Sequence, residues 1–141
     1  MNVKVIKRKL NIYPKFHQTD MMGVIHNSQY FLWFEEGRLE IMKEIISIEE
    51  AISRGFITPV IENKCEYKRY VKFGDPLILF TTHEKINVYE GRLIFFHSLV
   101  HQITKLEMAS GYSAITIVDY KTGRLIKEWP QDLWKKYLEL K

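Results

Sequence analysis

The sequence predicts an α+β domain in which antiparallel strands wrap around one long helix. A segment from Ser28 to Ile46 is rich in Leu, Ile, Met and Glu and lacks both proline and strand-like alternation, which favours a helix. One strand-like run precedes it and several follow, separated by Gly, Asp and Pro turn signals. Because the later connections are short, neighbouring strands are expected to be antiparallel.

The segment from Ser28 to Ile46 is expected to lie at the centre of the domain. At about 100° per residue its apolar side chains, including Leu32, fill a broad arc, and only a narrow stripe around Glu36 and Lys43 stays polar. Such a helix must be covered on most of its circumference. Glu35 and Arg38 fall within the arc three residues apart, so we expect a paired structural charge there.

The remaining elements follow from the same signals. Strands are expected over residues 3–13, 59–71, 77–89, 92–104 and 108–119. Glu90-Gly91 is typical of a hairpin turn, and Gly74-Asp75-Pro76 of a turn between two earlier strands. Short helices are expected over residues 48–54, before Gly55, and over residues 130–140, after a proline start.

Length and composition favour one domain spanning residues 1–141. The chain has 46% apolar residues and a formal net charge of +4, so a globular domain is expected. The basic residues are dispersed, which argues against a nucleic-acid partner. No run is long and apolar enough to predict a membrane span or a signal peptide, so a cytoplasmic location is the default expectation.

Several kinds of chemistry lack their usual signals in this sequence. Cys65 is the single cysteine, and no histidine lies at zinc-site spacing from it, so no structural metal is expected. Neither a nucleophile elbow nor a glycine-rich phosphate loop is present. We therefore expect no metal or organic cofactor. The absence of these motifs also argues against hydrolases that depend on them.

Two blocks of residues are more specific. The first contains Asp20, Gly23, Tyr30 and Glu35-x-x-Arg38, and the second, from residue 67 to 77, contains Gly74-Asp75. Together they resemble the hot-dog thioesterases of the 4-hydroxybenzoyl-CoA thioesterase type. The resemblance implies a hot-dog fold, acyl-CoA thioesterase activity, and a homodimer or homotetramer in which sheets join edge to edge and the sites lie at the interface.

The first block has a physical rationale for thioester hydrolysis. The reaction needs a nucleophile or general base and donors for the developing oxyanion. Asp20 lies in the loop before the long helix, whose first turn offers free N–H groups and positive dipole potential. The resemblance implies that a backbone N–H at Asn27, or next to it, polarises the carbonyl. Covalent attack and general-base hydrolysis both remain open.

Each of these residues also has a structural interpretation. Asp20 before Gly23 is common in turns, and Asn27 and Ser28 are both preferred helix N-caps. Some relatives carry His where this chain has Asn27, whose amide can donate a hydrogen bond but cannot shuttle a proton. His26 stands one place earlier, where a loop hydrogen-bonding role is favoured over a base.

We expect the substrate to contact Gly23, His26, Tyr30, Lys68 and Lys72. The two lysines would meet CoA phosphates, although solvated cations on a strand are an equally good interpretation. Strand alternation places Arg69 on the opposite face unless the strand bulges or ends.

Two alternatives from other classes remain. One is a non-catalytic acyl-CoA-binding or regulatory protein, and the other is an acyl dehydratase or hydratase of the same fold. The acyl chain length, an aryl preference, and the choice between CoA and an acyl carrier protein are not determined by the sequence.

Overall fold

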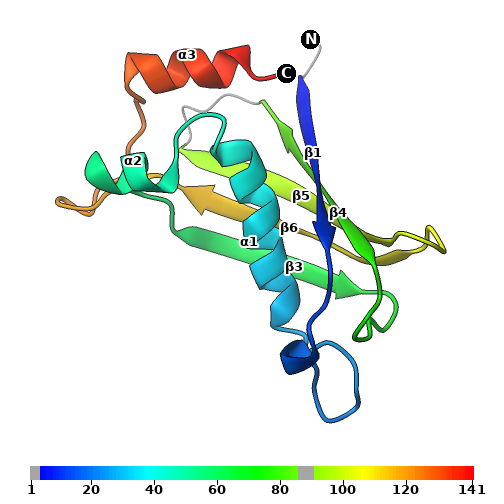
Figure 1. Cartoon of the computed structure of the whole chain (residues 1–141). Helices are drawn as coiled ribbons and strands as arrows, with labels where there is room; N and C mark the ends of the chain where they lie inside the picture. The colour runs from blue at the N-terminus through cyan, green and yellow to red at the C-terminus, as the bar shows by residue number, and fades with distance from the viewer. Residues whose placement is uncertain (1–3, 86–90) are drawn as a thin grey trace.

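A five-stranded antiparallel sheet with one helix against its face dominates the computed structural model, which describes residues 4–85 and 91–141 (Figure 1). Every hydrogen-bonded neighbour pair is antiparallel. This arrangement confirms the predicted α+β fold class. In spatial order the strands are β1 (Val5–Ile12), β4 (Leu77–Glu84), β5 (Arg92–His101), β6 (Glu107–Thr116) and β3 (Val60–Tyr67).

The long helix α1 (Gln29–Met42) crosses the concave side of this sheet. It is shorter than the expected segment because the chain tightens into turns after Met42, where the Glu44 N–H donates to the Ile41 carbonyl at 3.1 Å. At Gly37 the helix backbone lies close to the sheet. A Cβ atom there would lie 2.3 Å from Thr81 Oγ1 and 2.7 Å from Leu79 Cδ2, so only glycine allows this contact.

Two residues expected on the covered side of α1 lie on the side that faces away from the sheet. Leu32 is 54% exposed, and the Glu35 side chain is 55% exposed. The expectation that both lie in the covered arc is wrong, because the sheet covers the helix from one side only. Arg38 is buried, with its Nη2 atom 3.7 Å from Glu35 Oε2, so the pair joins a buried cation to an exposed carboxylate.

Smaller elements lie near both ends of α1 (Figure 1). The short helix η1 (Phe16–Gln18) follows β1, and α2 (Ile48–Ser53) follows α1. A two-stranded pair, β2 (Phe56–Ile57) with β7 (Val118–Asp119), was not predicted separately. The helix α3 (Gln131–Glu139) packs its Tyr137 into the core. The predicted Glu90-Gly91 turn lies partly outside the described residues.

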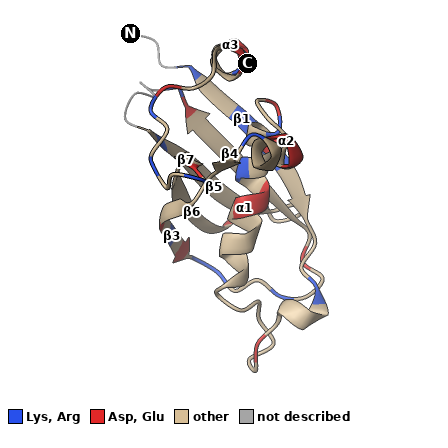
Figure 2. Ribbon diagram, turned by 90° about the vertical axis from the view of Figure 1, so that its left-hand side faces the viewer, with Lys and Arg blue, Asp and Glu red and all other residues tan. Residues whose placement is uncertain are grey.

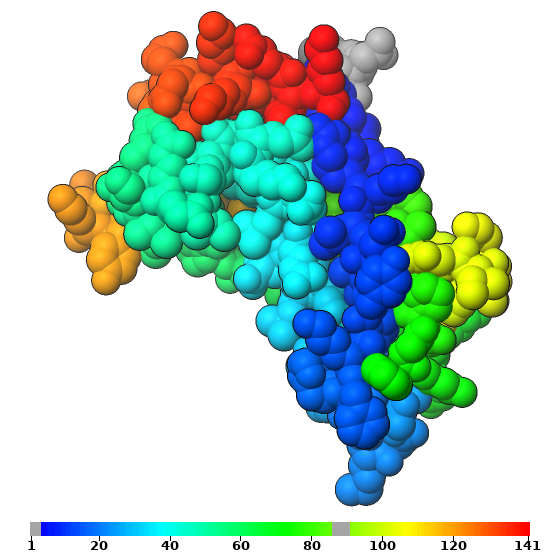
Figure 3. All heavy atoms as spheres, viewed as in Figure 1, coloured from blue at the N-terminus to red at the C-terminus, as the bar shows by residue number. Residues whose placement is uncertain are grey.

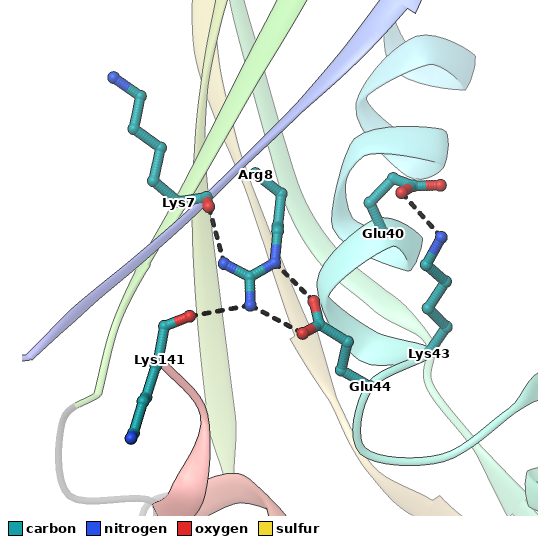
Figure 4. Close-up of polar contacts among 6 residues, drawn as sticks. All are labelled: Lys7, Arg8, Glu40, Lys43, Glu44 and Lys141. Carbon is teal, nitrogen blue, oxygen red and sulfur yellow. Dashed lines mark hydrogen bonds and ion pairs between the residues drawn. The ribbon is translucent and has the colours of Figure 1, made fainter.

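A polar contact fixes the far end of α1 to the edge strand β1. The Arg8 guanidinium donates to both carboxylate oxygens of Glu44, at 2.6 and 2.7 Å, and also to the carbonyl of Lys141 (Figure 4). The contact therefore joins β1, the turn after α1 and the end of the described chain.

Within residues 4–85 and 91–141 no helix is long and apolar enough to cross a membrane.

A buried histidine lies beneath the centre of α1. The His97 ring stacks on Phe34 with centroids 4.3 Å apart, while its two nitrogens contact Thr81 Oγ1 at 3.0 Å and Ser113 Oγ at 2.9 Å. Burial, with a smaller contribution from the Arg38 charge, lowers the pKa of His97 to about 3. His97 is therefore neutral in the folded protein across the physiological range.

This pKa predicts acid sensitivity of the fold. Unfolded His97 binds a proton near pH 6.5 and folded His97 only near pH 3, so the free energy of unfolding should decrease as the pH falls between these values, by up to about 1.4 kcal/mol per pH unit. His97→Gln should have a smaller slope in urea unfolding measured from pH 7 to pH 4. Equal slopes for both proteins would contradict the assignment.

Candidate functional site

The loop from residue 19 to 25 projects beyond the N-terminal end of α1 (Figures 1 and 3). Two isolated bridges fix its base, one between Thr19 and Ile25 and one between Val24 and Lys72. The Ile25 N–H also donates to the Val71 carbonyl at 2.8 Å. The loop is thus attached to the segment that follows β3, although the two are far apart in the sequence.

Asp20 stabilises the turn of this loop with one of its carboxylate oxygens. Its Oδ1 accepts from the N–H of Met22 at 2.8 Å and of Val24 at 3.4 Å. Gly23 completes the turn with φ of +77°, a left-handed conformation that favours glycine. No hydrogen bond reaches the other oxygen, Oδ2, from any described residue. The turn interpretation and a chemical role are therefore compatible, because they use different oxygens.

Of the three residues before α1, His26 and Ser28 are bonded to each other. His26 Nδ1 lies 2.7 Å from Ser28 Oγ and accepts from the Ser28 N–H at 3.2 Å. The His26 carbonyl accepts from the Gln29 N–H at 3.0 Å. Ser28 occupies the expected N-cap position, but its side chain makes no capping bond. Among the described residues nothing bonds to the N–H or side-chain amide of Asn27, so these donors remain available.

The second side of the site is formed where β3 ends. The strand stops at Tyr67, and the next residues run irregularly, with the N–H groups of Lys68 and Arg69 both donating to the Met108 carbonyl. Lys68 and Arg69 therefore lie beyond the strand, and the alternation that would place their side chains on opposite faces does not apply to them. A basic stretch directly follows β3 (Figure 2).

A cavity of about 490 Å³ lies between these two sides. Its lining comes from the loop, from the start of α1 and from the end of β3. The lining residues are Asp20, Met22, Val24, Ile25, Asn27, Tyr30, Tyr67, Lys68, Arg69 and Tyr70. The cavity thus combines one carboxylate, free amide donors, several apolar side chains and two cations.

The two cations in the cavity differ in how they are engaged. The Lys68 ammonium pairs with the Glu107 carboxylate, which also accepts from Ser98 Oγ at 2.5 Å. These contacts, chiefly the one with Lys68, hold the pKa of Glu107 below its usual value. Arg69 donates through Nη1 to the Glu107 carbonyl at 3.0 Å, and its guanidinium forms no ion pair with a described residue. Its charge is therefore the less neutralised of the two.

Two tyrosines form an apolar wall of the cavity. Tyr30 is 2% exposed and meets the Tyr67 ring edge-to-face, with centroids 4.8 Å apart. Burial raises the pKa of Tyr30, and it raises that of Tyr67 to about 12. Both phenols are therefore protonated near neutral pH.

The structure brings together four of the seven residues expected from the sequence. Asp20, Asn27, Tyr30 and Lys68 line the cavity, whereas Gly23, His26 and Lys72 are not among its lining residues. The substrate contacts expected of Gly23, His26 and Lys72 stay predictions. Sequence reasoning missed Tyr67, and it placed Arg69 away from Lys68. Neither Gly nor Pro marks the end of β3, so no local signal revealed that the alternation stops there.

Gly74-Asp75 in the second block forms a turn and lies outside the cavity lining. Gly74 has φ of +89°, and Asp75 Oδ2 accepts from the Lys72 N–H at 2.8 Å. His101 Nε2 lies 3.5 Å from Asp75 Oδ1. Over the described ranges, no group of three or more His, Cys, Asp or Glu side chains is placed to hold a metal ion.

Two known proteins with related sequences are named as an acyl-CoA thioesterase and an esterase. YneP of Bacillus subtilis (strain 168), which carries the provisional name of acyl-CoA thioesterase, is 25% identical over 83 residues, or 58% of this chain and 60% of that protein. A provisionally named esterase of Aquifex aeolicus (strain VF5) is 31% identical over 79% of this chain and 84% of its own length.

Solved structures share the fold. A DHNA-CoA thioesterase from Staphylococcus aureus superposes with a TM-score of 0.86 at 22% identity, covering 95% of this chain and 90% of that one. The model of the thioesterase-like superfamily matches residues 14–136, which include both sides of the cavity. The resemblance noted in the sequence is thereby confirmed, and the chain belongs to the thioesterase-like superfamily.

Proposed function

We propose that this protein hydrolyses acyl-CoA thioesters to a carboxylic acid and CoA. The observation that carries the proposal is that the Asp20 carboxylate and the free amide donors of Asn27 line the same cavity. Family membership and the names of the relatives support the reaction class. The chemistry requires no metal or organic cofactor.

Asp20 would supply the nucleophile or the general base through Oδ2, because Oδ1 is occupied by the loop N–H groups. In one route Oδ2 attacks the thioester carbon, and water then hydrolyses the resulting anhydride. In the other, Oδ2 accepts a proton from water as the water attacks. Both routes expel the CoA thiolate and develop negative charge on the carbonyl oxygen. The Asn27 N–H would stabilise that charge, and the first turn of α1 would add positive dipole potential.

Replacing Asp20 tests this role. Asp20→Asn keeps an oxygen that can accept from the loop N–H groups but removes the nucleophile and base, so kcat should fall about 10²-fold to 10⁴-fold without loss of thermal stability. The measurement is thiol release from a panel of aliphatic and aromatic acyl-CoAs. Asp20→Ala should lose the turn contacts as well.

Asp119→Asn is the matched control, because Asp119 Oδ1 also accepts from two N–H groups, of Lys121 and Thr122, in a turn before a glycine. Its activity should equal that of wild type. A folded Asp20→Asn protein with unchanged turnover would refute the catalytic assignment. If wild type releases no thiol yet is stabilised by acyl-CoA, the protein binds its ligand without turnover.

The cationic end of the cavity would bind the CoA phosphates. Arg69 is better suited to this than Lys68, since Glu107 neutralises Lys68 while the Arg69 guanidinium keeps donors free. Lys72, for which the sequence also predicted contact with the CoA phosphates, is not among the lining residues of the cavity.

Substituting Arg69 measures this contribution. Arg69→Gln should raise KM for acyl-CoA about 10-fold with little effect on kcat, because a contact present in both ground and transition states is lost. Arg124→Gln, on an exposed turn, is the charge-matched control. The same KM for Arg69→Gln and for the control would contradict phosphate binding by Arg69.

The cavity borders a free sheet edge, and we propose that this edge pairs with a second copy. β3 lies at one end of the five-stranded sheet, next to β6, and all of its residues except the partly buried Cys65 are exposed. An exposed edge of this length invites pairing with another strand. Antiparallel pairing of two β3 strands around a two-fold axis would form a homodimer with a site near each end of the interface.

Light scattering tests the assembly. Wild type should have at least twice the 16.9 kDa mass of one chain. Ile61→Lys places a charge on β3, where Ile61 is 51% exposed, and should shift the protein toward the monomer. Ile103→Lys, at a residue 76% exposed in the turn after β5, should not. A monomeric wild type would rule out the dimer.

A further inference from the structure

The peptide group between Asn27 and Ser28 is held at both of its ends. Its carbonyl, that of Asn27, accepts from the Tyr67 hydroxyl at 2.8 Å. Its N–H, that of Ser28, donates to His26 Nδ1 at 3.2 Å. Two side chains therefore fix the orientation of one peptide plane, immediately next to the Asn27 donors that line the cavity.

Both the backbone and the ring of Tyr67 are fixed, so its hydroxyl is well placed to hold this peptide. Tyr67 is the last residue of β3 and pairs with the buried Ala109 of β6. Its ring packs edge-to-face on Tyr30, a core residue of the first turn of α1. With a pKa raised to about 12, the hydroxyl keeps its proton and remains a donor throughout the neutral range.

No other contact within the described part of the chain replaces this one. The Tyr67 hydroxyl is the partner of the Asn27 carbonyl, and α1 lacks a side-chain N-cap that would fix its first residues. The hydrogen bond also joins the two sides of the cavity, the start of α1 and the end of β3. Without it, the peptide between Asn27 and Ser28 would be held only by the local bond from the Ser28 N–H to His26.

We propose that Tyr67 is a positioning residue: by holding the peptide between Asn27 and Ser28, it sets the orientation of Asn27 and of its adjoining N–H toward the reacting carbonyl, while His26 holds the other end of that peptide. The proposal rests on the thioesterase function proposed above. Tyr67 acts through Asn27, because its single hydroxyl proton is donated to the Asn27 carbonyl. His26 acts as a hydrogen-bond acceptor at Nδ1, so its role needs no proton transfer.

Removal of one oxygen atom tests the role of Tyr67. Tyr67→Phe keeps the ring contact with Tyr30 and loses only the hydroxyl, so kcat for acyl-CoA should fall about 10-fold to 100-fold, as expected when a reacting group is displaced. KM should change less than about 3-fold, and the pH profile of kcat should keep its shape. Tyr120→Phe, at a residue 74% exposed and remote from the cavity, is the matched control.

His26 provides an independent second pair of variants. His26→Ala should lower kcat in the same way, because the Ser28 N–H loses its acceptor. His26→Asn should restore most of the activity, since an asparagine oxygen can accept the same N–H across two residues, as in an Asx turn. A proton-transfer role for His26 predicts instead that both variants are equally impaired.

Several results would overturn the positioning role while leaving the thioesterase function intact. These are an unchanged kcat in Tyr67→Phe, a rise in KM alone, a shifted pH profile, or a loss matched by a fall in thermal stability. Failure of His26→Asn to recover activity would count against the role of His26. A wild type that releases no thiol from any acyl-CoA would overturn the proposed function and the positioning role together.

Discussion

The structure depends on how closely α1 approaches the sheet. At Gly37 the helix backbone lies so near β4 that a single added Cβ would overlap Thr81 and Leu79. One turn earlier, Phe34 stacks on the buried His97 ring, whose nitrogens are bonded to neighbouring strands. These contacts fix the depth and direction of α1, and they determine where its N-terminus emerges.

The position of that N-terminus creates the site. The loop with Asp20 precedes it, and this loop is attached to the residues after β3 by the bridge from Val24 to Lys72 and by the hydrogen bond from Ile25 to Val71. Carboxylate, helix start and strand end therefore enclose one cavity although they come from three parts of the chain. Asp20 stabilises the turn through one oxygen, and the other accepts no hydrogen bond from a described residue, so its structural role and its proposed catalytic role are compatible.

The electrostatic character of the cavity also depends on contacts distant in sequence. Glu107 begins β6, yet it neutralises Lys68 and leaves Arg69 as the more available cation. Tyr67 and His26 similarly converge on a single peptide from opposite sides. A ligand with an anionic end and a polar carbonyl fits this distribution, which extends from the basic stretch after β3 to the donors at Asn27.

The sequence by itself determined the fold class and the order of the elements, and it singled out Asp20 and Asn27 as candidate site residues, because helix periodicity, turn residues and a local motif are encoded over short stretches. Only the tertiary structure decided that Arg69 lines the cavity together with Lys68, that Leu32 and Glu35 face outward, and that Tyr67 donates to the Asn27 carbonyl. Those outcomes depend on where β3 ends and on which side of α1 the sheet covers. Both are set by packing between segments that lie far apart in the chain, which local patterns do not record.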